Sequence, residues 1–186
     1  MWISNSAIFG MCDTSIAILI VLIIIIVYYI VHTRCQALQI MRKLWSEHVY
    51  FTREYILMTL ANIASVKDFV VTKLMKNQED IGKQTLIRHG IDPTDLLKEH
   101  ISIGATIINK TFNEQDASAD VTSWYQNGDK LSALFNGINK RFTSEIMKKH
   151  LDDTIVECQQ VFARQDSMAT FDKIHNHVLY MAELLA

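Results

Sequence analysis

The chain has 186 residues, a formal net charge of −2 and 20% charged residues. This balance provides no basic patch for a polyanion, so the sequence excludes nucleic acid as an expected partner. Only one proline and six glycines occur, and so few helix breakers favour an all-α fold over a loop-rich or all-β one. The three cysteines, Cys12, Cys35 and Cys158, form no CxxC pair, which predicts reduced thiols rather than a disulfide framework.

The first expected element is a transmembrane helix at residues 13–32. The stretch 16–31, IAILIVLIIIIVYYIV, carries no charge. Because crossing the hydrocarbon core takes roughly 20 residues, the helix should start between residues 10 and 14 and end near His32. The side chains expected to anchor it in the bilayer include Ile16, Leu19, Leu22, Ile25, Tyr28 and Tyr29. We therefore expect a short segment 1–12, the transmembrane helix 13–32 and a helical-bundle domain 33–186.

A cleaved signal peptide is the alternative interpretation of this apolar stretch. It fits less well, because no basic residue precedes the stretch and no small-x-small cleavage site follows it. His32, Arg34, Arg42 and Lys43 follow the stretch, whereas the only charge before it is that of Asp13. The positive-inside rule then places the C-terminal domain of a single-pass protein on the cytoplasmic side.

Apolar residues at steps of three and four predict helices along the rest of the chain. The expected helices begin at about Ala37, Ser65, Pro93, Val121, Thr143 and Met168. Asp92 is expected to cap the third of them. Since short connections make neighbouring helices antiparallel, the prediction is an antiparallel up-and-down bundle of about six helices in three hairpins, 37–90, 92–138 and 141–186.

A histidine followed by an aliphatic residue recurs in WSEHV (45–49), LKEHI (97–101), MKKHL (147–151) and IHNHV (174–178). His48, His100 and His150 each lie in the first helix of a predicted hairpin, about 50 residues apart. Those helices should point the same way, so the three histidines are expected at a similar height. Reflection through a turn near 166 places His177 level with Ile155, more than a helical turn away, so the fourth fragment is interpreted as coincidence.

Polar residues should gather around these histidines. Reflection through a turn near 65–66 places Arg53 level with Gln78, and His48 level with Gly82 and Lys83. The expected polar layer is His48, Arg53, Gln78, Asp80, Glu99, His100 and His150.

One interpretation of the layer is a transition-metal site. Imidazole and carboxylate suit iron, zinc or manganese, and the candidate ligands are His48, His100, His150 and Asp153. The pattern departs from di-metal bundles, which place Glu-x-x-His pairs on facing helices. Glu47-His48 and Glu99-His100 are adjacent, so the two side chains of each pair diverge on a helix.

Two other interpretations stay open. The layer could be a buried structural network in which Arg53 pairs with Asp80 and the other polar groups satisfy one another. It could also be a pocket for a small ligand or for a partner's charged side chain. The sequence contains no phosphate-binding glycine loop, no GxSxG and no HExxH, so no catalytic residue is predicted.

The strings EHVYFTREYI (47–56), KNQEDIGKQ (76–84), KEHI (98–101), WYQNGDKLSALFNGIN (124–139) and KHLDDT (149–154) occur in this order. In this the chain resembles a family of small helical-bundle proteins of bacteria, such as bacilli, and of large eukaryotic DNA viruses. The resemblance covers about residues 44–184 and implies no secure activity. It implies a shared set of His48, Thr52, Arg53, Asn77, Gln78, Asp80, Glu99, His100, Trp124, Asn127, His150 and Thr154. The chain departs from the bacterial members in its apolar segment.

The sequence thus predicts a single-pass membrane protein that acts by interaction. Its expected role is that of a structural component presenting a bundle at a membrane surface, as a minor capsid-associated component on the internal membrane of a virus particle. Its expected partners are the lipid bilayer and proteins at the membrane surface, such as capsid proteins, and no cofactor is expected. The alternative is a membrane-tethered bundle that binds a transition metal or a small ligand and could be an enzyme.

Overall fold

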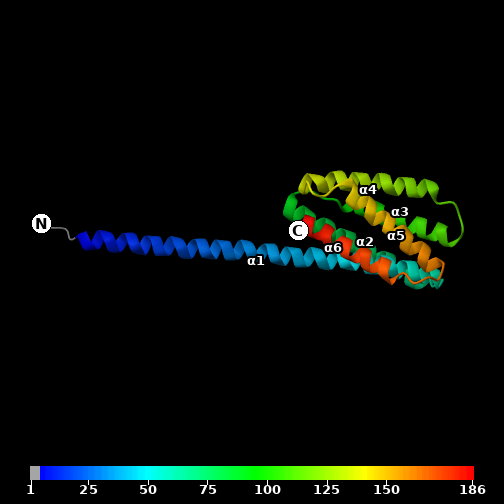
Figure 1. Cartoon of the computed structure of the whole chain (residues 1–186), viewed down its shortest axis with the longest axis horizontal. Coiled ribbons are helices and arrows are strands. Elements are labelled where there is room, and N and C mark those ends of the chain that lie inside the picture. The colour runs from blue at the N-terminus through cyan, green and yellow to red at the C-terminus, as the bar shows by residue number, and fades with distance from the viewer. Residues whose placement is uncertain (1–4) are drawn as a thin grey trace. The chain divides into compact units, whose positions relative to one another are not determined.

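The computed structural model describes residues 5–186, and side chains from residue 15 onward. In that part of the chain all regular structure is helical, which confirms the predicted all-α class (Figure 1). The helices are α1 (Asn5–Leu60), α2 (Ala64–His89), α3 (Thr94–Phe112), α4 (Ser118–Ile138), α5 (Ser144–Phe162) and α6 (Met168–Leu185). The first four residues of the predicted segment 1–12 lie outside the described residues. The side chain of Asp13, in the predicted transmembrane helix, also lies outside them.

Helix α1 is long and apolar enough to cross a membrane, by length and composition. The side chains from Ile16 to Val31 are exposed, including those of all six predicted anchor residues. An exposed apolar segment of this kind near the N-terminus is typical of a membrane span and of a signal sequence alike. The chain divides into two compact units, one that ends at Gln39 and one that spans Ile40–Ala186.

The second unit is a helical bundle. Helix α2 packs against α3, α3 against α4, α4 against α5, and α5 against α6; α3 also packs against α5. Hydrogen bonds join the α1 residues of this unit to the other helices. The Asn77 amide of α2 donates to the carbonyl of Leu44 (2.9 Å), and Arg42 donates to Glu183 of α6 (3.1 Å).

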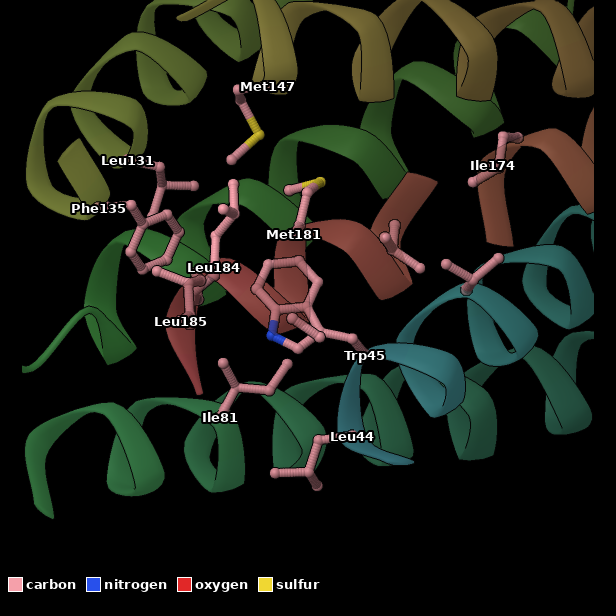
Figure 2. Close-up of a cluster of buried hydrophobic side chains, with 14 of the residues drawn as sticks. Leu44, Trp45, Ile81, Leu131, Phe135, Met147, Ile174, Met181, Leu184 and Leu185 are labelled. Atoms are coloured by element: carbon pink, nitrogen blue, oxygen red, sulfur yellow. The ribbon is translucent and has the colours of Figure 1, made fainter. Parts of the chain in front are cut away.

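Two clusters of buried apolar side chains fill the bundle. The larger cluster takes residues from all six helices, and Figure 2 shows Trp45 of α1 among side chains of α2 and α6. The smaller cluster consists of Tyr55, Ile56, Val70, Leu74, Ile101, Ile108, Cys158 and Val161. Truncating a large side chain in such a cluster costs about 2–5 kcal/mol, so these two clusters fix the positions of the helices that carry the polar residues.

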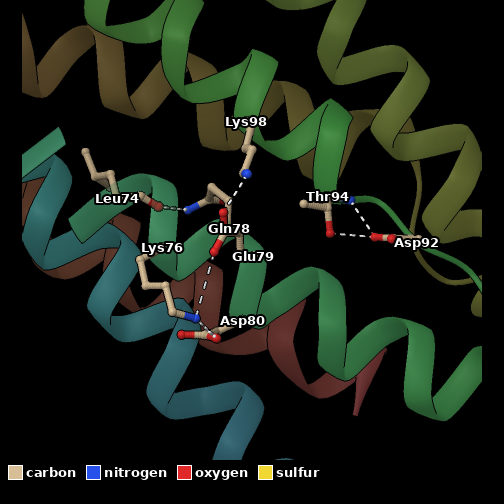
Figure 3. Close-up of polar contacts among 8 residues, drawn as sticks. All are labelled: Leu74, Lys76, Gln78, Glu79, Asp80, Asp92, Thr94 and Lys98. Carbon is tan, nitrogen blue, oxygen red and sulfur yellow. Dashed lines mark hydrogen bonds and ion pairs between the residues drawn. The ribbon is translucent and has the colours of Figure 1, made fainter. Parts of the chain in front are cut away.

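The connection between α2 and α3 places the start of α3 one residue later than predicted. Gly90 has φ of 70° and donates its N–H to the Leu86 carbonyl (2.9 Å), a left-handed helix end that glycine adopts at least cost. Helix α3 begins at Thr94, with Pro93 at the N-cap position. Asp92 still serves the helix start, because its carboxylate accepts hydrogen bonds from the N–H and the hydroxyl of Thr94 (Figure 3).

A candidate ligand site among three buried histidines

The structure brings together one histidine from each of three helices. His48 on α1, His100 on α3 and His150 on α5 are 5%, 5% and 4% exposed. The ring centroid of His150 lies 5.7 Å from that of His48 and 6.2 Å from that of His100. The three side chains therefore meet in the interior of the bundle, at the similar height that their spacing in the sequence predicts.

The side-chain amide of Gln78 on α2 contacts the ring of His48, and the amide of Asn77 helps to orient it. Asn77 donates to the Leu44 carbonyl, and its Oδ1 accepts from Gln78 Nε2 (2.9 Å). Gln78 Nε2 also donates to the Leu74 carbonyl (3.2 Å; Figure 3) and lies 3.3 Å from His48 Nδ1. A flipped Gln78 amide would set its oxygen against two acceptors, so its orientation is fixed. Both N–H groups of Gln78 are then used by the two oxygens, and a proton on His48 Nδ1 would face them. The lone pair of His48 Nδ1 therefore lies toward the amide, and the ring proton is on Nε2.

An amide of α4 holds the ring of His100 in the opposite sense. Asn127 Nδ2 donates to the Leu96 carbonyl (3.0 Å) and to Glu99 Oε2 (2.9 Å). Its Oδ1 is consequently the atom 3.0 Å from His100 Nδ1, so Nδ1 donates and Nε2 carries the lone pair. Trp124 stacks on this ring at 5.0 Å between centroids and donates its indole N–H to the His100 carbonyl (3.0 Å).

The imidazole of His150 differs from the other two. Its Nδ1 is fully buried and has no hydrogen-bond partner among the described residues. Only its backbone carbonyl is bonded, by the hydroxyl of Thr154 (2.8 Å), as the carbonyl of His48 is by Thr52 (2.8 Å). Buried polar atoms in native proteins are nearly always paired. The unpaired nitrogen therefore marks a position where a further hydrogen-bonding group would be favourable.

Burial keeps all three imidazoles uncharged. Burial, with a smaller effect of His100, lowers the pKa of His48 to about 3. Burial lowers the pKa of His100 to about 4, although the hydrogen bond with Asn127 acts in the opposite direction. The pKa of His150 lies well below its ordinary value because the ring is buried and has the other two histidines beside it. At neutral pH each ring thus supplies one N–H donor and one acceptor nitrogen.

A cavity of about 140 Å³ lies against the three histidines. Most of its wall is apolar and comes from both clusters of the core, including Tyr55, Leu74, Ile101, Ile108, Trp124 and Cys158. Burial raises the pKa of the Cys158 thiol to about 12, so this wall residue stays protonated and unreactive. A dry cavity of about 150 Å³ holds a benzene molecule, so the space suits one small ring.

The arginine predicted for the layer lies elsewhere. Arg53 forms an ion pair with Glu157 of α5, whereas Asp80 pairs with Lys76 on the surface (Figure 3). The predicted pairing of Arg53 with Asp80 is therefore wrong. Because α1 ends at Leu60 and α2 begins at Ala64, the turn comes earlier than the assumed position near 65–66.

The same early turn changes the partner of His48. Reflection placed His48 level with Gly82 and Lys83, but its hydrogen-bond partner is Gln78, about one helical turn away. Gly82 instead lies against the start of α3. A Cβ atom on it would be 1.9 Å from Oγ1 of Thr94, so α2 and α3 approach closely there.

The carboxylate of the predicted metal site is directed away from the histidines' nitrogens. Asp153 accepts hydrogen bonds from Lys149 and from Lys173 of α6 (2.6 Å). Within the described chain, no three or more histidine, cysteine or acidic side chains form a group that could hold a metal ion. The described geometry therefore does not fit the predicted ligand set of His48, His100, His150 and Asp153.

The position predicted for His177 is also wrong. Its Nε2 lies 2.8 Å from the carbonyl of Ile146 rather than level with Ile155. The cause is the register of α6 on α5, because the chain after the turn is shifted along α5 from a symmetric pairing. His177 thus lies near enough to His150 to contribute to lowering its pKa, but it does not line the cavity.

Glu157 is the buried residue that the sequence argument missed. The residue is 1% exposed, and its partner Arg53 also donates to the hydroxyl of Ser167 (3.1 Å). Burial raises the pKa of Glu157, although Arg53 acts in the opposite direction. A signal was present in the sequence, because His150, Thr154 and Glu157 follow one another at steps of four and three along one helix face.

No protein-family model, curated protein or solved structure matches this chain. The resemblance to the helical-bundle family therefore stays a prediction. The function is inferred from the geometry of the site itself.

Proposed function

We propose that this protein is a membrane-tethered helical bundle that binds a small, uncharged, largely apolar molecule in the cavity beside His48, His100 and His150. The observation that carries this proposal is the combination of a cavity of about 140 Å³ with a buried, unpaired Nδ1 of His150. A network that only specified packing would be expected to satisfy its own buried atoms.

The composition of the wall supports an uncharged ligand. The three imidazoles are neutral at physiological pH, and the partly buried Arg53 is already paired with Glu157. Moving a charge from water into such a wall without a countercharge is strongly unfavourable. An apolar ligand instead gains about 25 cal/mol for each Å² of surface it removes from water.

The bundle would be held at the membrane by residues 16–31. The exposed apolar side chains of this segment support a retained anchor. The basic residues after it support an orientation in which the bundle, built of three hairpins, lies on the cytoplasmic side. Intact mass and carbonate extraction of the expressed chain test the anchor. A chain that has lost this segment would instead indicate a cleaved signal sequence, and an intact chain released by carbonate would rule out a transmembrane anchor.

Ligand binding is tested with fluorobenzene and the full chain in phosphatidylcholine nanodiscs, observed by ¹⁹F NMR. The variant Ala105→Phe places a ring in the cavity, because Ala105 lines it. The matched control is Thr106→Phe, which adds the same ring at an exposed neighbouring position. We expect saturable binding to the native chain and to Thr106→Phe, and none to Ala105→Phe beyond partition into empty nanodiscs. Equal signals from both variants would contradict the proposal.

The second candidate is the structural role predicted from the sequence, a scaffold at a membrane that contacts surface proteins such as capsid proteins of a virus particle. It is supported by the bare apolar surface of residues 16–31, which serves a scaffold as well as a binding protein. The two roles predict different behaviour of the same variant. A scaffold keeps its membrane and protein contacts in Ala105→Phe, whereas a ligand-binding protein loses its ligand.

A further inference from the structure

The two amide contacts give the cavity histidines opposite tautomers. Gln78 leaves the proton of His48 on Nε2, and Asn127 leaves the Nε2 of His100 unprotonated. The hydrogen bonds given for the two rings both use Nδ1. Since each ring turns its Nδ1 to an amide, Nε2 is the nitrogen available to the cavity that both rings line. The cavity therefore offers one donor and one acceptor, on rings that flank His150.

This pair of atoms selects among uncharged polar groups. A hydrocarbon would leave both nitrogens unpaired, and leaving a buried polar group unpaired is costly. An ether or a ketone accepts hydrogen bonds but cannot donate one to His100. A hydroxyl group accepts and donates at the same oxygen, so it matches the donor on one ring and the acceptor on the other.

The space around the nitrogens favours a flat ring over a branched chain. The volume of about 140 Å³ is close to that of a cavity known to hold benzene. The wall contains the rings of Tyr55 and Trp124, and Trp124 is fixed by its stacking on His100 and its hydrogen bond to the His100 carbonyl. Aromatic walls add geometric preference for an aromatic guest.

We propose that the ligand is a small, uncharged phenol whose hydroxyl accepts from Nε2 of His48 and donates to Nε2 of His100. This inference rests on the proposed ligand-binding function and adds its chemical class. The aromatic ring contacts the apolar wall of the cavity. His150, whose Nδ1 is unpaired in the described chain, is available to pair with a second polar substituent of the same molecule.

Two ring probes of similar size separate the class from the function. The full chain in phosphatidylcholine nanodiscs is titrated with 4-fluorophenol and with fluorobenzene by ¹⁹F NMR, and the free concentrations are taken from empty nanodiscs. We expect 4-fluorophenol to bind about tenfold or more tightly, since it gains two net hydrogen bonds. The variant His100→Phe keeps the volume and removes the acceptor but leaves the donor of His48, so we expect it to lower the preference for 4-fluorophenol severalfold. The matched control His89→Phe, at a histidine bonded to the Leu185 carbonyl, should keep the native preference.

Each outcome decides one claim. Equal binding of both probes to the native chain would overturn the phenol inference and leave the binding function standing. Failure of both probes to bind, with water alone in the cavity, would overturn the function as well. Competition by cyclohexanol as strong as that by phenol would overturn the aromatic class.

A measurement without any variant tests the tautomers directly. A two-bond ¹⁵N–¹H spectrum of the imidazole rings distinguishes protonated from unprotonated nitrogens. We expect the proton on Nε2 in His48 and on Nδ1 in His100. The same tautomer in both rings would overturn the donor–acceptor assignment and with it the phenol inference.

Discussion

Acidification should destabilise the bundle well before its carboxylates titrate. The folded chain holds His48 and His100 neutral, with pKa values lowered to about 3 and about 4. In the unfolded chain both return to about 6.5. The unfolded state therefore binds more protons below pH 6.5. Their contribution to stability is complete above that pH and is lost as the pH falls through the window from 6.5 toward 4 and 3.

The size of the effect follows from these two values. At about pH 5 each histidine is almost wholly protonated in the unfolded chain and almost wholly neutral in the folded one, which costs about 2 kcal/mol each relative to about pH 8. The two together remove about 4 kcal/mol, a large part of a typical domain stability of 5–15 kcal/mol. His150 acts in the same direction. Glu157 acts in the opposite one, since burial raises its pKa and a protonated Glu157 favours the folded state.

The assay is urea unfolding of the full chain in mild detergent, followed by tryptophan fluorescence at several pH values between about pH 8 and about pH 5. The buried rings of Trp45 and Trp124 report loss of the core. We expect His100→Phe to reduce the slope by about 1.4 kcal/mol per pH unit, the contribution of one proton. A change in unfolding free energy below about 1 kcal/mol across this range, or a slope unaffected by the variant, would refute the reasoning.

Three further predictions concern packing, a buried charge and metal content. We expect Gly82→Ala to lower the unfolding free energy by about 1–3 kcal/mol, because the new Cβ meets Thr94. The control Gly137→Ala has open space around it and should not lower it. Equal melting temperatures of the two variants would contradict this prediction. Arg53→Met should cost about 3–5 kcal/mol in urea unfolding by leaving Glu157 buried without its partner, and adding Glu157→Leu should recover most of it; no recovery would contradict the pairing. Elemental analysis of the full chain, purified without chelators or a histidine tag, should find no transition metal near one equivalent, and a stoichiometric metal would contradict the geometry of the site.

The histidine layer was predictable because it depends on spacing alone. Helices of similar length joined by short connections bring residues of similar offset to the same level, so His48, His100 and His150 could be placed together from the sequence. The connection between α2 and α3 was predictable to within one residue for a similar reason, because Gly90 and Asp92 stop and start helices through local backbone chemistry.

The partners of that layer were not predictable, because they depend on register. A turn shifted by a few residues moves a side chain by about a helical turn, which exchanged Gly82 for Gln78 as the neighbour of His48. The same shift separated Arg53 from Asp80 and left Glu157 as its partner. The histidine tautomers are harder still to predict from the sequence, because they depend on the carbonyls that orient Gln78 and Asn127.

The cost of the site distinguishes a binding role from a packing role. A buried polar atom without a partner costs about 1–3 kcal/mol, and the bundle bears that cost at His150 next to a cavity that also forgoes packing. Larger apolar side chains that also filled the space would remove both costs. A ligand that pairs these nitrogens and fills the space would offset them, and at about 100 times its dissociation constant it would stabilise the fold by about 2.7 kcal/mol. The expected consequence is that a phenol raises the melting temperature of the native chain but not that of Ala105→Phe, in which the cavity is already filled.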